Sequence, residues 1–170
     1  LYFATYTKQV DGGVMITGSH NPSNHNGFKI SLGKESLYGS QINEIKEIAF
    51  SEDFLADDGT NENLGILDDY LTALSQKIDF GNRKLKAVID AGNGMGGLTA
   101  VPLYKSLGVE VVEIFCEPDS SFPNHPADPS QEENLQDLIA KVIETKADIG
   151  IAFDGDADRI TIIDDTGRII

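Results

Sequence analysis

The chain has 170 residues, with 28 acidic and 13 basic side chains, a formal net charge of −15 and 40% hydrophobic residues. This length allows one large domain or two small ones, and the composition is that of an ordinary soluble globular protein. The excess of negative charge disfavours a general nucleic-acid-binding protein, which needs a basic surface. Phosphorylated substrates stay possible, because a site needs only local positive charge or a metal.

Membrane and secretory classes are also disfavoured. No apolar run approaches the roughly 18 residues of a membrane span, and the first residues lack the basic-then-apolar pattern of a signal peptide. A single cysteine, Cys116, excludes an internal disulfide framework and is typical of a reducing compartment. We therefore expect a cytoplasmic protein without membrane partners, in which Cys116 is a small, partly buried filler at a strand end.

The first third of the chain predicts short strands, one helix and a linker. Residues 1–35 favour strands on either side of a Ser-His turn, and the first strand is expected within residues 1–7. Residues 40–50 carry isoleucines at helical spacing, with Ser40 as a possible N-cap. Residues 51–66 are acidic, polar and rich in turn-forming residues, so we expect them to link two domains.

The remainder of the chain predicts alternating strands and helices. Asp68 or Asp69 is expected to cap a helix that runs through Lys77. Further strands are expected at residues 84–90, 109–115, 148–154 and 159–167, and further helices at 94–107, closed by Gly108, and at 132–146. A Pro-rich loop is expected at 117–130. This alternation is typical of a layered α/β domain with a mainly parallel sheet.

The sequence DGDADR, residues 154–159, follows the third of these strands at its carboxyl end, where open α/β sheets place ligand sites. Asp154, Asp156 and Asp158 alternate there and would repel one another unless a positive group lies between them. A divalent cation with oxygen ligands is the natural partner, although a solvated acidic turn is the simpler alternative. An EF-hand is rejected, because Arg159 stands where that loop requires glycine and strands replace its flanking helices.

A second motif, TGSHNP, occupies residues 17–22. Ser19 is a candidate nucleophile, but a serine hydroxyl must be activated, and His20 is a candidate partner. The alternative is a turn in which Ser19 bonds only to the backbone. Downstream, Asn26-Gly27 indicates a tight turn that leads into a strand. Lys29 would lie near the start of that strand, close to the Ser19 loop or facing solvent.

A third motif joins the strand at 84–90 to the helix that follows it. Gly92, Gly94 and Gly97 satisfy the G-x-G-x-x-G spacing of dinucleotide-binding folds, and Glu113 closes the next strand. The motif alone is common. We favour a structural strand-to-helix turn in which small residues allow close packing, and we keep an NAD(P)-binding dehydrogenase domain as an alternative.

Taken together, T-G-S-H-N-P, N-G-F-K and, far downstream, D-G-D-A-D-R resemble the α-D-phosphohexomutase family, and within it the bacterial phosphomannomutase/phosphoglucomutase group. The intervening segments DAGNGMGG and FPNHPADPSQEENLQDLI resemble the same family, so the resemblance covers essentially the whole chain. Either motif alone is less specific than the pair.

The resemblance implies a mechanism and a set of site residues. Ser19 matches the family's phosphoserine, and the glycine loop matches a structural turn without a dinucleotide. His20, Lys29 and Arg159 match positions that line the site around the transferring phosphate. Asp154, Asp156 and Asp158 match the ligands of a Mg²⁺ ion whose shell a phosphoserine oxygen completes. The implied reaction is reversible phosphoryl transfer between hexose 1-phosphate and hexose 6-phosphate, of mannose and/or glucose, through a hexose 1,6-bisphosphate.

The family also implies a four-domain enzyme, of which this chain holds two partial or complete layered α/β/α domains with mixed, mainly parallel sheets. Residues 1–60 match the later part of the first domain, and residues 61–170 match the second. The chain starts without methionine, so we expect a piece of a longer protein that is inactive or a poor catalyst alone. A non-catalytic divalent-metal-binding module stays a further alternative.

Overall fold

The computed structural model describes residues 1–22, 24–52 and 54–170, and the chain forms two compact units. The first unit consists of residues 1–16 and 28–66, and the second of residues 17–27 and 67–170. The loop at 17–27 therefore belongs by its contacts to the second unit, although the strands that flank it belong to the first. Residues 23 and 53, in the predicted strand region and the predicted linker, lie outside the described residues.

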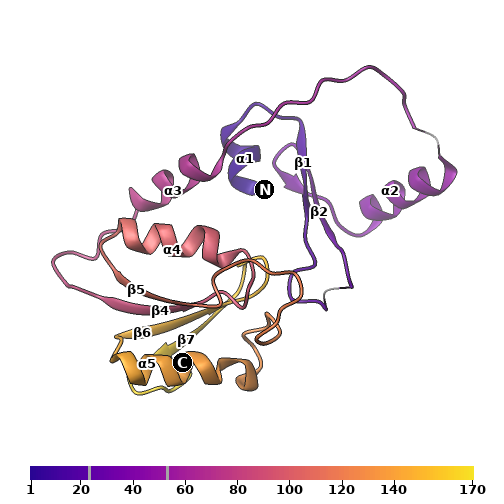
Figure 1. Ribbon diagram of the computed structural model, residues 1–170. Coiled ribbons are helices and arrows are strands. Elements are labelled where there is room, and N and C mark those ends of the chain that lie inside the picture. The colour runs from indigo at the N-terminus through magenta and orange to yellow at the C-terminus, as the bar shows by residue number, and fades with distance from the viewer. Residues whose placement is uncertain (23, 53) are drawn as a thin grey trace. The chain divides into compact units, whose positions relative to one another are not determined.

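The first unit contains a three-stranded antiparallel sheet and two helices (Figure 1). Its elements are helix α1 (Tyr2–Thr7), strands β1 (Gly12–Ile16), β2 (Phe28–Leu32) and β3 (Glu35–Ser36), and helix α2 (Ser40–Ser51). β2 lies in the middle of the sheet, with Val14 of β1 opposite Ile30. The strands predicted around the Ser-His turn are therefore confirmed. Residues 54–66 form neither helix nor strand, as expected for the linker.

Two expectations for this unit are wrong. Residues 2–7 form a helix and not a strand, although tyrosine, phenylalanine and threonine favour strands. The hydroxyls of Thr5 and Thr7 donate to carbonyl oxygens three and four residues earlier, and Thr5 is buried, so tertiary packing overrides the local preference. The helix at 40–50 is confirmed, but its N-cap is Gly39, and Ser40 is its first helical residue.

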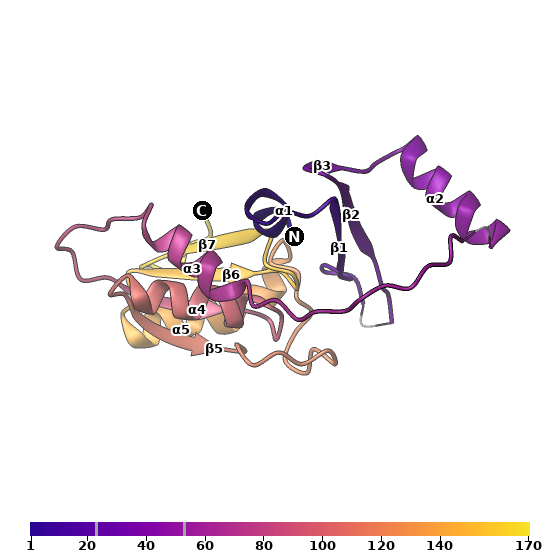
Figure 2. The same cartoon turned by 90° about the horizontal axis from the view of Figure 1, so that it is seen from above.

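The second unit is a layered α/β/α structure around a four-stranded sheet in the order β5-β4-β6-β7. Strands β4 (Lys86–Asp90), β5 (Glu110–Ile114) and β6 (Ile149–Phe153) are parallel, and β7 (Ile160–Asp164) is antiparallel to β6. Helices α4 (Gly96–Ser106) and α5 (Gln136–Thr145) cover opposite faces of the sheet (Figure 1). β5 and β7 form its two edges (Figure 2). The mixed, mainly parallel sheet confirms the predicted fold class.

The core has two parts because successive residues of β4 point to opposite faces. Val88 packs under α5 with Leu138 and Val142, whereas Ile89 packs under α4 with Ala100. All of these side chains are buried. The amphipathic spacing that predicts α5 therefore describes its buried face correctly.

Several boundaries in this unit differ from expectation. Helix α3 (Leu67–Ser75) packs on α4, and it holds Asp68 and Asp69 in its first turn rather than at its cap, where their charge favours the helix dipole. The helix expected at 132–146 begins as a 3₁₀ helix, η1 (Glu132–Leu135), before α5. Gly108 follows α4 with a φ of +80° and donates its N–H to the Lys105 carbonyl, which confirms the predicted C-terminal signal.

Candidate metal and phosphoryl-transfer site

The loop between β6 and β7 is organised around the buried carboxylate of Asp154. Its Oδ1 accepts the N–H groups of Asp158 and Arg159 at 3.0 and 3.1 Å, and its Oδ2 accepts Nε–H of Arg159 at 3.1 Å. Asp154 is fully buried and directly follows β6, so it lies at the carboxyl end of this parallel strand. One side chain thereby fixes the turn that carries the other two aspartates.

Asp154, Asp156 and Asp158 form a cluster of hard oxygen donors. Each offers a carboxylate oxygen, and these three atoms lie within 4.8 Å of one another. Oxygen ligands on opposite sides of Mg²⁺ or Ca²⁺ lie roughly 4–5 Å apart, because each metal–oxygen distance is about 2.0–2.6 Å. The spacing and the donor type therefore fit a hard divalent cation, and they fit a softer metal poorly.

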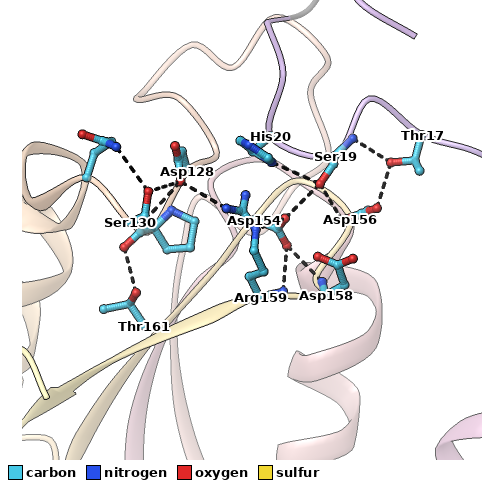
Figure 3. Close-up of polar contacts among 12 residues, drawn as sticks. Thr17, Ser19, His20, Asp128, Ser130, Asp154, Asp156, Asp158, Arg159 and Thr161 are labelled. Atoms are coloured by element: carbon cyan, nitrogen blue, oxygen red, sulfur yellow. Dashed lines mark hydrogen bonds and ion pairs between the residues drawn. The ribbon is translucent and has the colours of Figure 1, made fainter. Parts of the chain in front are cut away.

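The loop at 17–27 brings Ser19 to this cluster (Figure 3). Ser19 Oγ lies 3.2 Å from Asp154 Oδ2 and 3.3 Å from Asp156 Oδ1. It also lies 3.2 Å from Nδ1 of His20. A hydroxyl has one proton and two acceptor lone pairs, so Ser19 Oγ can accept a hydrogen bond from His20 while it donates to a carboxylate.

Thr17 connects the two loops through a side chain that the sequence does not single out. Its Oγ1 donates to Asp156 Oδ2 at 3.1 Å and accepts the N–H of Ser19 at 2.8 Å (Figure 3). Ser19 has a φ of +51°, in the left-handed region that residues other than glycine rarely adopt. The Thr17 contacts hold this backbone conformation, which is the kind found at functional sites.

Gly155 allows the two loops to touch. A Cβ at this position would overlap the carbonyl oxygen of Ser19, so only glycine permits the observed approach. The Gly155 carbonyl oxygen also accepts the N–H of Met95 at 2.9 Å, from the glycine turn before α4. Gly155 is therefore packed between the Ser19 loop and that turn.

Arg159 extends the site on the other side of Asp154. Its Nε donates to Asp154, and its Nη1 lies 3.7 Å from Asp128 Oδ1. Its Nη2 is buried and has no hydrogen-bond partner within the part of the chain that the structure describes. A buried donor without a partner is costly, so this nitrogen fits an anionic ligand.

The carboxylate of Asp128 faces Nη1 of Arg159 (Figure 3). Burial opposes ionisation of Asp128, but hydrogen bonds from Ser130 and the nearby charge of Arg159 outweigh it and hold the pKa of Asp128 below its usual value. The Ser130 hydroxyl donates to Asp128 Oδ1 at 2.7 Å. The carboxylate that faces Arg159 is thus negatively charged at neutral pH.

The structure brings together six of the seven predicted site residues, namely Ser19, His20, Asp154, Asp156, Asp158 and Arg159. The seventh, Lys29, is the second residue of β2 in the first unit, and its role stays a prediction. Sequence reasoning missed Thr17 and Asp128. Thr17 lies within the TGSHNP motif, whereas Asp128 in the Pro-rich loop gave no signal beyond its turn-forming neighbours.

The Asn26-Gly27 pair does not form the expected tight turn. The strands β1 and β2 are joined by the whole loop at 17–27, which closes where the N–H of Thr17 donates to the Gly27 carbonyl. A Cβ on Gly27 would lie 2.5 Å from the Thr17 carbonyl oxygen. Gly27 is therefore required for close approach at the base of the loop.

The glycine motif at residues 92–97 packs against protein backbone. A Cβ on Gly94 would lie 2.6 Å from the Gly155 carbonyl oxygen, and a Cβ on Gly97 would overlap the Cys116 carbonyl oxygen. In dinucleotide-binding folds the second glycine lets the backbone approach a pyrophosphate, but here the backbone of Gly155 takes that place. This packing favours the structural turn over the dinucleotide alternative.

Cys116 takes no part in the site. Burial raises the pKa of its thiol to about 11, with a further contribution from the charge of Glu113, so it stays protonated. This agrees with its expected role as a partly buried filler. Among the described residues, every helix is too short or too polar to span a bilayer.

Comparison with known proteins gives concordant results. Residues 68–167 match the family described as "Phosphoglucomutase/phosphomannomutase, alpha/beta/alpha domain II", and residues 1–56 match the corresponding domain I. The chain is 46% identical over its full length to "Phosphomannomutase/phosphoglucomutase" of Pseudomonas putida, and 48% identical to "Phosphoglucomutase" of Neisseria meningitidis serogroup A. It spans 36% and 37% of the lengths of these two proteins.

Solved structures agree with these relatives. A "Phosphoglucomutase/phosphomannomutase family protein" from Burkholderia thailandensis has a TM-score of 0.91 and 44% sequence identity, over 96% of this chain and 35% of that one. A "putative phosphomannomutase" from Thermus thermophilus has a TM-score of 0.83 and 25% identity, over 99% of this chain and 40% of that one. Both similarities extend over nearly the whole chain.

Proposed function

Because this chain belongs to the phosphoglucomutase/phosphomannomutase family, we propose that the protein containing it transfers a phosphoryl group reversibly between hexose 1-phosphate and hexose 6-phosphate. The transfer uses a phosphoserine at Ser19 and a hexose 1,6-bisphosphate intermediate, with mannose and/or glucose as the sugar. The observation that supports this most is the position of Ser19 Oγ, within 3.3 Å of two carboxylates of the aspartate cluster and 3.2 Å from His20.

We expect Asp154, Asp156 and Asp158, together with a phosphate oxygen on Ser19, to hold Mg²⁺. A phosphorylated Ser19 would place a doubly charged group beside two carboxylates, which repel it unless a cation lies between them. The oxygen ligands fit Mg²⁺ by type. When bound, the cation draws negative charge away from the phosphoryl oxygens and so lowers the barrier to their transfer.

His20 is proposed to handle the proton at Ser19. In the first half-reaction a sugar hydroxyl releases its proton to water as its oxygen bonds to phosphorus, the bond from phosphorus to Ser19 Oγ breaks, and His20 gives its proton to Ser19 Oγ. In the second half-reaction Ser19 Oγ attacks the other phosphate of the bisphosphate, and its proton goes to His20. The released sugar oxygen takes up a proton from water, and the phosphoserine is restored.

Arg159 is proposed to balance charge on the transferring group. Its buried Nη2 is directed by the Asp154 and Asp128 carboxylates, which hold the other guanidinium nitrogens. A planar guanidinium suits the equatorial oxygens of a phosphoryl group, on which negative charge is spread during transfer. Lys29 is proposed, from the family resemblance, to supply a second positive charge.

The alternatives explain less of the site. A dehydrogenase domain leaves the contact between Ser19 and the aspartates without a purpose, and the turn at 92–97 is packed against protein backbone. A non-catalytic metal module accounts for the aspartate cluster. It does not account for a serine held at a φ of +51° beside that cluster.

The proposal refers to a full-length protein, because the chain spans 36% of its Pseudomonas putida relative. We propose that residues 1–60 form the later part of the family's first domain and that residues 61–170 form the second; the matches at 1–56 and 68–167 support this division. The chain alone is expected to be inactive. Turnover equal to that of a full-length form would refute this expectation.

Peptide-mapped mass spectrometry tests the function directly. The full-length protein is incubated with a hexose 1,6-bisphosphate and Mg²⁺, in parallel with the Ser19→Ala variant as a control. We expect one phosphate on Ser19, lost when excess hexose monophosphate is added, and none on the variant. A folded, metal-loaded protein with Ser19 unmodified would refute the phosphoserine mechanism and favour the metal module.

A further inference from the structure

A pair of titratable side chains, Asp90 and His125, lies outside the residues that carry the proposed chemistry. Asp90 ends β4 and is fully buried, and its Oδ1 accepts the N–H of Gly92 at 2.8 Å. Its Oδ2 lies 3.2 Å from Nε2 of His125, whose side chain is only 13% exposed. The edge of this imidazole also packs on the ring of Phe115, with centroids 5.4 Å apart.

Both ring nitrogens of His125 face oxygen acceptors. Nε2 faces the Asp90 carboxylate, and Nδ1 lies 2.8 Å from the carbonyl oxygen of Pro126. A carbonyl oxygen cannot donate a proton, nor can a carboxylate without its proton. With Asp90 in the carboxylate form, both nitrogens of His125 must therefore donate. A neutral imidazole has one N–H, and only the imidazolium has two.

The electrostatic surroundings agree with this geometry. The hydrogen bond to Asp90 raises the pKa of His125, burial opposes this, and the bond to Pro126 raises it again. The charges of Asp90 on β4 and of Asp137 on α5 also raise the pKa of His125.

The Pro126 carbonyl connects this pair to Arg159. The same oxygen that faces His125 Nδ1 also accepts the N–H of Asp128 at 2.8 Å. The side chain of Asp128 then faces Arg159 Nη1 at 3.7 Å. Ala127, which lies between Pro126 and Asp128 in the chain, is buried and packs against Gly92. This packing limits the movement of the loop at 126–128.

We propose that His125 is a positioning residue whose imidazolium, held between Asp90 and the Pro126 carbonyl, fixes Asp128 and thereby orients the guanidinium of Arg159. Loss of the ring proton removes one of the two hydrogen bonds that His125 donates, so the loop at 125–128 loosens and Arg159 loses its contact with Asp128. The effect on catalysis rests on the proposed phosphoryl transfer, whereas the protonation of the ring and its coupling to Arg159 do not.

Nuclear magnetic resonance tests the protonation in the full-length protein. Nitrogen-15 in the histidine rings reports each ring's protonation, and the His125→Gln variant assigns the signal. We expect both nitrogens of His125 to carry protons at pH 7. A neutral ring with a single N–H, or a proton that resides on Asp90, would overturn the proposal. Asp90→Asn keeps the shape of the side chain and should make the ring neutral at pH 7.

The coupling is tested by following the Arg159 Nε–H signal through the same pH titration. We expect it to change with the midpoint of His125 in the wild type, and to lose this transition in Asp90→Asn. An Arg159 signal that ignores the titration of His125 would refute the positioning role. Neither readout requires catalytic activity, so both stand even if the proposed function fails.

Kinetics then test the consequence for turnover with a double-mutant cycle. His125→Gln and Asp128→Asn should each lower kcat about tenfold, with KM for hexose 1-phosphate within about twofold, because the reacting groups are misplaced and not removed. Since both act on the same arginine, the double variant should be no slower than the slower single one. Multiplied effects in a variant with wild-type circular dichroism would show independent roles and refute the proposal.

Discussion

Gly155→Ala is the substitution that most directly tests whether the Ser19 loop and the aspartate loop touch in solution. The added Cβ would overlap the Ser19 carbonyl oxygen, far inside the 3.0 Å below which real Cβ contacts are essentially never found. The obstacle is backbone and not the end of a flexible side chain. One of the two loops must therefore move.

The required movement can be compared with the contacts that it breaks. Relief of the overlap needs a displacement of about 1 Å, which would carry Ser19 Oγ from 3.2 and 3.3 Å to about 4 Å from the Asp154 and Asp156 carboxylates. Hydrogen bonds are not made at that distance. A misplacement of this size at a reacting group costs about 10²-fold in rate, and overpacking costs about 1–3 kcal/mol of stability.

The assay measures kcat for hexose phosphate interconversion and urea unfolding of the full-length protein and its variants. Gly59→Ala is the matched control, since a Cβ there meets no atom within 4 Å. We expect kcat to fall about 10²-fold in Gly155→Ala, whereas the control keeps wild-type kcat and a stability within about 0.5 kcal/mol. Wild-type turnover in Gly155→Ala would refute the inferred contact between the loops.

Three further predictions concern other parts of the second unit. Thr17→Val should lose about 1 kcal/mol of stability and about tenfold in kcat, because the hydrogen bond to Asp156 is removed. Thr17→Ser should retain the stability and the kcat of the wild type. Equal loss in the two variants would contradict the role of the hydroxyl. Measured by isothermal titration calorimetry, Asp156→Asn should weaken Mg²⁺ binding at least about tenfold. Asp165→Asn makes an equal charge change on the exposed turn after β7 and should leave Mg²⁺ binding unchanged. Equal weakening by the two variants would argue against a specific site. The pKa of His125 is raised above 6.5 in the folded state, so the folded protein holds this proton more tightly than the unfolded chain does. The contribution of the protonated ring to the free energy of unfolding is therefore complete below pH 6.5 and is lost as the pH rises through the raised pKa. Urea unfolding at pH 6 and 8.5 should show this loss in the wild type and not in His125→Gln.

The elements of the second unit could largely be predicted because their signals are local. Val88 and Ile89 lie in an apolar run that suits a strand buried on both faces, and the spacing of Leu138 and Val142 places both on one side of α5. Helix α1 could not be predicted in this way. Its residues favour a strand, and the helix is explained by the burial of Thr5 and by the hydroxyl hydrogen bonds of Thr5 and Thr7.

The residues of the candidate site also differ in whether their signals are local in the sequence. Asp154, Asp156 and Asp158 lie close in sequence, so their alternation after a strand already indicates a cation site. Thr17 shows no such signal, because its partner Asp156 is 139 residues away.

Local sequence patterns predict the strands and helices of the second unit, the aspartate cluster and the serine motif, because each depends on residues within a few positions of one another. The three-dimensional packing brings Ser19 Oγ to Asp154 across 135 residues and makes Gly155 the close contact that permits this approach. The same packing places both nitrogens of His125 against oxygen atoms. Distances between distant segments follow from how the sheet and loops pack, and no local pattern of residue types specifies them.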